Sequence, residues 1–279
     1  MSNSRHGAAL PVYRSLLFVP GNRPDRFDKA LASGADAVIV DLEDAVAPDA
    51  KDAARATLAA WAAPVHPVLV RINARGTEWF EQDILLGRLP GIAGIVLPKA
   101  GSAQDVTRVV AAARRRVPVL PIIESAQGIW NVEAVARAPG TRRLLFGTLD
   151  FIVDMGMPDD GDALSTFRAQ LALVSRVAGL APPVDGVMPD LQDNDRLVRE
   201  TLRGKSFGFG GKLCIHPAQV KTVNDCYRPS DAELAWATRV LAAVAAAGGN
   251  AVSVDGGMVD RPVVLKAERI LAQPGVGTA

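Results

Sequence analysis

The sequence predicts a TIM barrel, a closed ring of eight parallel strands in which a helix follows each strand. Three observations lead to this fold class: the chain of 279 residues is slightly longer than a typical single barrel, eight short apolar runs alternate with helical patterns, and the runs are continuously apolar. Strict alternation favours parallel pairing, and continuous apolar strands are expected where both faces of a sheet are covered. An open doubly wound sheet is the alternative, but eight regular units favour closure.

The apolar runs predict strands at Ser15–Val19, Ala37–Asp41, Val68–Ile72, Gly94–Leu97, Val119–Ile123, Leu144–Phe146, Val184–Val187 and Lys212–Ile215. The Ala-rich segments that follow them predict helices near Arg26–Ser33, Asp49–Ala62, Glu78–Leu86, Ala103–Arg114, Ile129–Ala136, Ala163–Gly179, Asp193–Arg203 and Pro217–Tyr227. Helix-start signals agree with these ranges. Pro24 stands in an expected first turn, and Asp49, Ser102 and Asp193 are N-cap candidates.

The C-terminal segment continues beyond the eighth unit. Ser230–Ala247 predicts a long helix, with Ser230 and Glu233 placed as a capping box. A glycine pair interrupts the pattern, and residues 251–272 are expected to hold a glycine-rich loop and one short helix. We therefore expect a barrel at 1–228 and a helical extension at 229–279, a lid or arm too small to fold alone.

Composition limits the functional classes. A net charge of +1 and 5% aromatic residues argue against a nucleic-acid partner. Cys214 and Cys226 lack the spacing of a metal site, which favours a reduced protein of the cytoplasm. The N-terminus shows no apolar signal segment, and no apolar run is long enough for a membrane span, so we expect no membrane association.

Two acids follow neighbouring expected strands, at the end where barrel enzymes carry their active sites. Glu124 follows the fifth strand, and Asp150 follows the sixth. Charge at the end of a buried strand is costly unless a cation or partner is present, and oxygen ligands without Cys or paired His suit a hard ion. The hypothesis is a divalent metal, Mg²⁺ or alternatively Mn²⁺. Spacing alone leaves open that these acids cap helices or pair with Arg71 and Lys99.

Other strand ends are also charged. Asp41, Glu43 and Asp44 could orient metal-bound water from behind the ligands, or could be acids favoured at a helix N-terminus. Arg71 ends the third strand, where a guanidinium beside a metal suits a carboxylate or a developing enolate oxygen. An ion pair with Glu43 or Glu124 is the alternative reading.

The first turn, PGNRPDRFDKA, brings together a glycine, a helix start and the bases Arg23, Arg26 and Lys29. Such a turn can bind phosphate, and solvent-exposed helix charge is the alternative. His66 precedes a strand and His216 is followed by Pro217, so neither histidine is expected to be catalytic.

Eight segments, in this order, carry a family resemblance: RSLLFVPGNRPDRFDKA, VIVDLEDAV, VLVRINA, GIVLPKA, LPIIESAQGI, FGTLDF, CIHPAQV and GGMVDRPVVLKAERIL. With them the chain resembles, over nearly its whole length, the citrate lyase β-subunit-like acyl-CoA lyases of the HpcH/HpaI aldolase superfamily. The resemblance implies a Mg²⁺-dependent barrel, commonly a trimer or hexamer. Such enzymes cleave a 3-hydroxy-3-carboxyacyl-CoA thioester to a 2-oxo acid and acetyl-CoA.

The resemblance also implies site residues. Glu124 and Asp150 would be the metal ligands, and Arg71 would bind substrate oxygens. Asp260, in the GGMVD segment, would be the catalytic acid/base and would enter from a neighbouring subunit. The CoA phosphates would lie near Arg23 and Lys29.

Alternatives stay open at this point. The pyruvate aldolase branch carries a His just after the second strand, where this chain has Leu42-Glu43-Asp44-Ala45, so a free-sugar-acid aldolase is disfavoured. A citrate lyase subunit acting on an acyl-carrier-protein thioester, a pyruvate aldolase and a non-catalytic barrel are the other readings. The sequence does not select among citryl, citramalyl, malyl and methylmalyl groups, which differ by a methyl or a carboxymethyl group.

Overall fold

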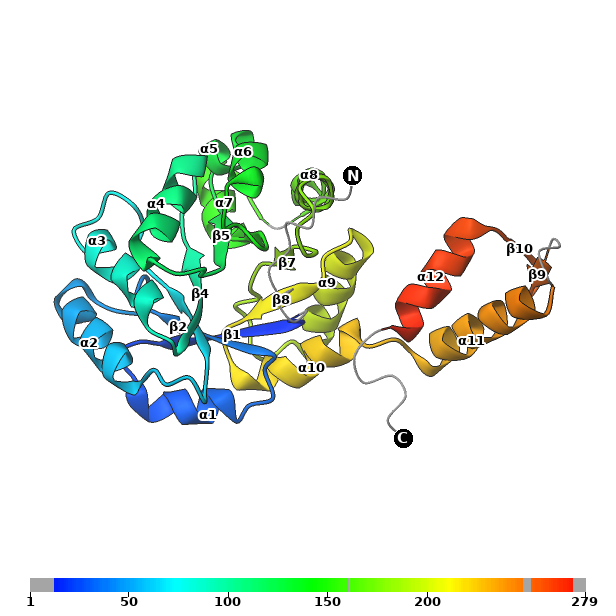
Figure 1. Ribbon diagram of the computed structural model, residues 1–279, viewed down its shortest axis with the longest axis horizontal. Coiled ribbons are helices and arrows are strands. Elements are labelled where there is room, and N and C mark those ends of the chain that lie inside the picture. The colour runs from blue at the N-terminus through cyan, green and yellow to red at the C-terminus, as the bar shows by residue number, and fades with distance from the viewer. Residues whose placement is uncertain (1–12, 160, 248–251, 273–279) are drawn as a thin grey trace. The chain divides into compact units, whose positions relative to one another are not determined.

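The predicted barrel is confirmed in the computed structural model, which describes residues 13–159, 161–247 and 252–272 (Figure 1). Eight parallel strands pair in chain order, and the last pairs with the first to close the ring. The strands are β1 (Ser15–Pro20), β2 (Ala37–Asp41), β3 (Val68–Arg71), β4 (Ile92–Leu97), β5 (Val119–Ile123), β6 (Leu145–Phe146), β7 (Val184–Asp185) and β8 (Gly211–Cys214).

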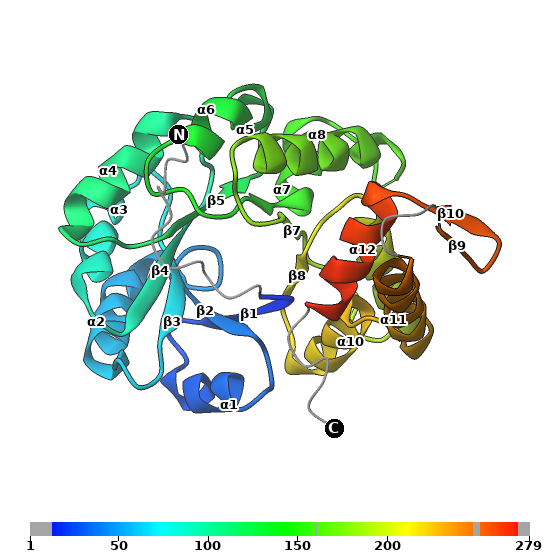
Figure 2. The ribbon, with the colours of Figure 1, turned by 45° about the vertical axis from the view of Figure 1, so that its right-hand side comes forward.

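Helices surround this ring on its outer side (Figure 2). They are η1 (Pro24–Arg26), α1 (Phe27–Leu31), η2 (Pro48–Ala50), α2 (Lys51–Trp61), α3 (Phe80–Asp83), η3 (Ile84–Arg88), α4 (Ala103–Ala113), α5 (Ala126–Trp130), α6 (Val132–Arg137), α7 (Thr148–Asp154), α8 (Ala163–Val177), α9 (Asn194–Ser206) and α10 (Pro217–Tyr227). Ser102 caps α4 and Asp193 caps α9, as expected. Asp49 is not a cap, because it lies inside η2, which begins after Ala47.

Strand residues alternate between two apolar layers. On β1, Leu16 belongs to the layer inside the ring, whereas Leu17 packs outward against the helices. The inner layer comprises Leu16, Ile39, Leu69, Val96, Leu120, Ile122, Leu145, Val184 and Leu213. Burial on both faces explains why the strands read as unbroken apolar runs.

The helix α7 was not predicted. The strand expected at Leu144–Phe146 is present as β6, and helix α7 begins at Thr148, directly after Gly147. Phe151 lies on the buried side of this helix, with ring centroids 5.3 Å from Phe146 and 4.8 Å from Phe167. Aromatic packing of this kind stabilises the early start of the helix. Asp150 therefore lies in a first helical turn rather than at a strand end.

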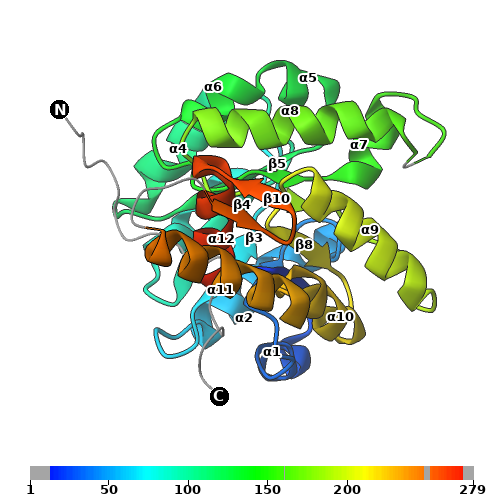
Figure 3. The ribbon, with the colours of Figure 1, turned by 90° about the vertical axis from the view of Figure 1, so that its right-hand side faces the viewer.

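The chain divides into two compact units between Tyr227 and Arg228, one residue before the expected boundary. The second unit holds helices α11 (Asp231–Ala246) and α12 (Arg261–Leu271), which lie side by side, and strands β9 (Val252–Val254) and β10 (Gly257–Val259) (Figures 1 and 3). Its own apolar cluster contains Ala237, Val240, Ala267 and Ile270. The predicted capping box of Ser230 and Glu233 is present.

The expected glycine-rich loop of this unit is instead an antiparallel hairpin of β9 and β10. Asp255 and Gly256 connect the two strands with φ values of 52° and 79°. Two consecutive positive φ values are the signature of a type I′ turn, for which Asp-Gly is a preferred sequence. None of the described helices has the length and apolar character that crossing a membrane requires.

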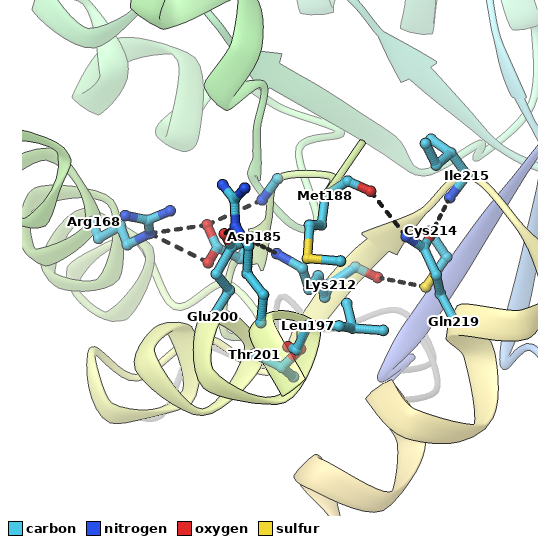
Figure 4. Close-up of polar contacts among 12 residues, drawn as sticks. Arg168, Asp185, Met188, Leu197, Glu200, Thr201, Lys212, Cys214, Ile215 and Gln219 are labelled. Atoms are coloured by element: carbon cyan, nitrogen blue, oxygen red, sulfur yellow. Dashed lines mark hydrogen bonds and ion pairs between the residues drawn. The ribbon is translucent and has the colours of Figure 1, made fainter. Parts of the chain in front are cut away.

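Buried ion pairs connect β7 and β8 to the helices outside them (Figure 4). Arg168 on α8 lies with its Nε 3.1 and 3.2 Å from the two carboxylate oxygens of Asp185, and both side chains are almost fully buried. Lys212 on β8 lies with its Nζ 3.8 Å from Glu200 on α9. Charged side chains are rarely buried unless they are paired, so these contacts bear on stability.

Arg168→Met should lower the free energy of unfolding by about 3–5 kcal/mol, because it leaves Asp185 buried without its cation. The matched control is Arg137→Met, which removes an exposed i,i+4 pair with Glu133 and should cost less than about 0.5 kcal/mol. Urea unfolding at pH 7 measures both changes. Equal losses in the two variants would contradict this account.

Candidate active site

A pocket of about 370 Å³ lies at the carboxyl ends of the barrel strands. Side chains on one face of a strand recur every second residue, so Phe18, Asp41, Arg71 and Glu124 lie one step beyond the inner layer of the barrel. The lining residues are Phe18, Pro20, Asp41, Asp44, Ala45, Arg71, Ile122, Glu124, Gly147, Thr148, Leu149, Asp150, Val187, Leu213 and Ile215. Five predicted site residues, Arg71, Glu124, Asp150, Asp41 and Asp44, are among them.

Glu124 directly follows β5 and is buried, with 4% of its surface exposed. Its Oε1 accepts a hydrogen bond of 2.6 Å from the backbone N–H of Lys99, a residue with φ of 49°. Its Oε2 lies so close to Gly147 that a Cβ at that position would overlap it. Burial, opposed by the hydrogen bond from Lys99 and assisted by the nearby Asp150, raises the pKa of Glu124 to about 7.

Asp150 approaches the pocket from the first turn of α7 and is exposed. Its charge acts on Glu124, so the two carboxylates face the same space as predicted, although only Glu124 extends from a strand. No group of three or more His, Cys, Asp or Glu residues capable of holding a metal occurs in the described parts of the chain.

Two carboxylates with open positions fit Mg²⁺, which is usually bound through one or two carboxylates and keeps water or substrate oxygens as its other ligands. A cation would also stabilise the carboxylates of Glu124 and Asp150. Glu124 is buried beside a like charge, and its Oε2 accepts no hydrogen bond from the described residues. A divalent ion would relieve both costs.

Arg71 is held rigidly at the end of β3. Its Nε and Nη2 donate hydrogen bonds of 2.7 and 2.6 Å to the two oxygens of Asp41, and its guanidinium stacks 4.8 Å from the ring centre of Phe18. Nη1 lies 3.1 Å from a Glu43 oxygen and 3.3 Å from an Asp44 oxygen. Burial alone would lower the pKa of Arg71, but these carboxylates outweigh it and raise the pKa above its usual value.

Residues 14–217 match the family described as HpcH/HpaI aldolase/citrate lyase. The chain belongs to this family. Residues 172–276 also match a family described as C–C bond lyase of the TIM-barrel fold. Both descriptions are those of enzymes that act on carbon–carbon bonds, so the protein is a carbon–carbon lyase.

Individual relatives agree with this assignment. The chain is 36% identical to a citrate lyase subunit beta-like protein of Deinococcus radiodurans, over 94% of this chain and 97% of that protein. It is 34% identical to the L-malyl-CoA/beta-methylmalyl-CoA lyase of Rhodobacter capsulatus, over 93% and 94% of the two chains. The CitE protein of Mycobacterium tuberculosis, solved with magnesium, acetoacetate and coenzyme A, superposes with a TM-score of 0.82 at 35% identity, over 95% and 97% of the two chains.

In this lyase, the acids of the β2 loop surround Arg71 rather than the Glu124–Asp150 pair. Asp41 also accepts hydrogen bonds from the backbone N–H groups of Glu43 and Ala45, at 2.9 and 3.1 Å. Burial raises the pKa of Glu43 to about 8. Within this net value Arg71 acts to lower the pKa, and the neighbouring acids act to raise it. Their direct contacts are with Arg71, so a role in orienting metal-bound water stays a prediction.

The first turn of the lyase lies close to the β2 loop but contributes no base to the pocket. The N–H of Gly21 donates to the Asp41 carbonyl at 2.8 Å, and a Cβ on Gly21 would lie 2.6 Å from Leu42. Arg23 pairs with Asp25 through two hydrogen bonds of 2.9 Å and is exposed, as is Lys29. Neither base lines the pocket, and phosphate binding by them stays a prediction.

Asp260 belongs to the second unit, where it is the N-cap of α12. Its Oδ1 accepts a hydrogen bond of 3.2 Å from the backbone N–H of Val263, and the side chain is exposed. This geometry explains the local sequence, since Asp is among the preferred N-cap residues and Pro262 stands in the first turn. Its catalytic role stays a prediction.

Sequence reasoning missed the residues that hold the charged loop in place. Lys51 donates from Nζ to the backbone carbonyls of Leu42 and Glu43, at 2.8 and 2.7 Å. Asp83 accepts from the backbone and side chain of Asn73, two residues after Arg71. The signal was present for Lys51, because a lysine at the start of a helix that follows an acidic loop can reach back to the loop carbonyls.

Glu124→Gln tests the buried carboxylate. Folded Glu124 binds its proton more tightly than the unfolded chain does, so it lowers stability as pH rises from about 4.5 to about 7, and the loss is complete above that range. In the presence of a chelator at pH 8, the variant should therefore be more stable than the wild type, by roughly 3 kcal/mol. Added Mg²⁺ should stabilise the wild type and not the variant.

Thermal and urea unfolding of both proteins, at pH 5 and pH 8, measures these differences. Glu133→Gln, at an exposed carboxylate, is the control and should change neither quantity. A Glu124→Gln protein that responds to Mg²⁺ like the wild type would show that Glu124 is not a metal ligand.

Proposed function

We propose that the protein is a Mg²⁺-dependent lyase that cleaves a 3-hydroxy-3-carboxyacyl-CoA thioester to a 2-oxo acid and acetyl-CoA by retro-Claisen chemistry. The observation that carries the proposal is one pocket, in a chain of the carbon–carbon lyase type, that joins the buried Glu124, Asp150 and the fixed guanidinium of Arg71. Relatives support the substrate class, because one is named as a malyl-CoA lyase and another was solved with magnesium and coenzyme A.

Each pocket residue has a role in this reaction. Glu124 and Asp150 would hold Mg²⁺, which would chelate the hydroxyl and carboxylate of the substrate and lower the hydroxyl pKa. Arg71 would bind oxygens on the oxo-acid side and offset their negative charge. Two of its five N–H groups donate to Asp41, and Nη1 lies within 3.3 Å of Glu43 and Asp44, so substrate oxygens would share the guanidinium with these acids.

We propose Asp260 as the catalytic acid/base, in the pocket of a neighbouring copy of the chain: its carboxylate would accept the proton of the substrate hydroxyl and, after the carbon–carbon bond breaks, donate it to the carbon of the thioester enolate. The protein would be a homo-oligomer, a trimer or hexamer, located in the cytoplasm. The location is proposed because Cys214 and Cys226 are both free. Arg23 and Lys29 would contact the CoA phosphates outside the pocket.

The test is a coupled assay of the purified chain with Mg²⁺, following 2-oxo acid release from citramalyl-, malyl- and citryl-CoA. Release that EDTA abolishes, together with equimolar acetyl-CoA, is expected for one of these thioesters. Free CoA without a 2-oxo acid would instead indicate hydrolysis, the activity named for a (3S)-malyl-CoA thioesterase that is 35% identical over 94% of this chain. No reaction with any CoA ester would favour a carrier-protein thioester or an aldolase.

Asp260→Asn should reduce turnover by at least about 100-fold while Mg²⁺ and 2-oxo acid binding stay unchanged, because the variant lacks only the proton donor. Asn is an equally good N-cap, so the helix α12 keeps its start. Asp255→Asn is the matched control, an exposed acid in the hairpin turn of the same unit. A near-normal rate in Asp260→Asn would remove Asp260 from the mechanism.

A further inference from the structure

Two apolar residues that line the pocket lie beyond the point where the backbone pairing of β7 with β8 ends. Val187 follows β7 and Ile215 follows β8, and both line the pocket. The ladder between these strands pairs Val184 with Gly211 and Asp185 with Lys212, and it ends there. The two walls therefore extend beyond the last backbone pairing that joins β7 to β8.

The lower part of each strand is anchored from outside. Asp185 is paired with Arg168 of α8, and Lys212 is paired with Glu200 of α9 (Figure 4). These contacts fix the strands where the ladder still exists. They do not reach the residues that form the walls.

The side-chain amide of Gln219 spans the gap between the two walls. Its Nε2 donates to the carbonyl of Met188 at 2.9 Å, and its Oε1 accepts from the backbone N–H of Ile215 at 2.9 Å (Figure 4). Gln219 lies in the first turn of α10 with 4% of its surface exposed. A primary amide has both a donor and an acceptor in one plane, so it replaces the backbone pairing that the ladder no longer provides.

We propose that Gln219 is a positioning residue that sets the spacing of Val187 and Ile215 and thereby the preference of the enzyme among acyl groups. The inference rests on the proposed thioester lyase function. The acyl groups in question differ by as little as one methyl group, and pockets distinguish such groups by the fit of apolar walls. A wall whose backbone donor or acceptor is left unpaired would shift to recover a hydrogen bond, because an unmet buried polar group is costly.

Gln219→Met removes both hydrogen bonds and keeps the length of the side chain. Tyr227→Phe is the matched control, because Tyr227 joins the same helix, α10, to the opposite end of β8. Its hydroxyl donates to the carbonyl of Gly211, at the start of β8, at 3.0 Å, and it is buried. Both variants lose buried hydrogen bonds made by side chains of α10, but only Gln219→Met removes bonds to the segments that carry Val187 and Ile215.

Two measurements are made on wild type and both variants. Hydrogen exchange of the Ile215 amide should accelerate by about tenfold or more in Gln219→Met and stay unchanged in Tyr227→Phe, because only the first variant removes the acceptor of that N–H. The ratio of kcat/KM for citramalyl-CoA to that for malyl-CoA should change roughly threefold to tenfold in Gln219→Met only. If Gln219→Met does not fold, Gln219→Asn keeps the amide but is too short to span both walls, and it should shift the ratio in the same direction.

Unchanged exchange of the Ile215 amide in Gln219→Met would show that Gln219 does not hold this segment in place. Faster exchange with an unchanged ratio of the two kcat/KM values would show that Gln219 does not influence specificity. A similar change of ratio in Tyr227→Phe would attribute the effect to general loosening and would also overturn the proposal. The exchange measurement needs no substrate, so it separates a failure of the bridge from a failure of the lyase function, which the wild-type assay decides. If wild type cleaves neither thioester, the ratio of their affinities by calorimetry replaces the kinetic ratio, with the same expected change.

Discussion

The bidentate pair between Arg71 and Asp41 is the contact on which the pocket depends. Asp41 ends β2 and Arg71 ends β3, and the two residues are direct partners in the strand register. Both follow inner-layer residues by two positions, so the alternation that fills the barrel also brings the guanidinium and the carboxylate together. Phe18 on β1 supports the guanidinium by the same alternation. Three adjacent strands thus fix one cation at the opening of the barrel, and a binding group that is already immobile loses little entropy when a substrate arrives.

Charge balance explains why this arrangement calls for a divalent ion. The charged residues that line the pocket are four carboxylates and one guanidinium, and Arg71 is already paired with Asp41. A substrate that carries a carboxylate would enter a region of excess negative charge, with Glu124 and Asp150 on its path. A divalent cation between these two acids reverses the local sign and gives the substrate oxygens a partner. Burial raises the pKa of Glu124 to about 7, in the direction expected for a carboxylate removed from water.

The barrel could be predicted because each strand is covered on both faces, which makes its sequence continuously apolar, and because the strands alternate regularly with helices. The predicted site residues Glu124 and Arg71 follow from the same reasoning, since both stand at strand ends. Asp150 was predicted to lie at the end of the sixth strand, but it belongs to the first turn of α7, where Phe151 packs against Phe146 and Phe167. The pairing of Arg71 with the β2 acids depends on register between strands, and the bridge of Gln219 depends on where the ladder ends. Neither is encoded by local periodicity.

The ladders on one side of the barrel are short, and this determines where side chains must replace backbone. The strands β6 and β7 have two residues each and are joined by the single pair of Leu145 and Val184. On this side Arg143 donates to the carbonyl of Pro182 at 2.6 Å, and Gln219 donates to the carbonyl of Met188. Long strands fix their neighbours by many equivalent backbone bonds, so one substitution changes little. Where only a few side-chain hydrogen bonds hold neighbouring strands together, a single substitution can move a wall of the pocket without unfolding the barrel. On the proposed function, the side of the barrel formed by β6, β7 and β8 is therefore the place where selectivity for the acyl group is most easily altered.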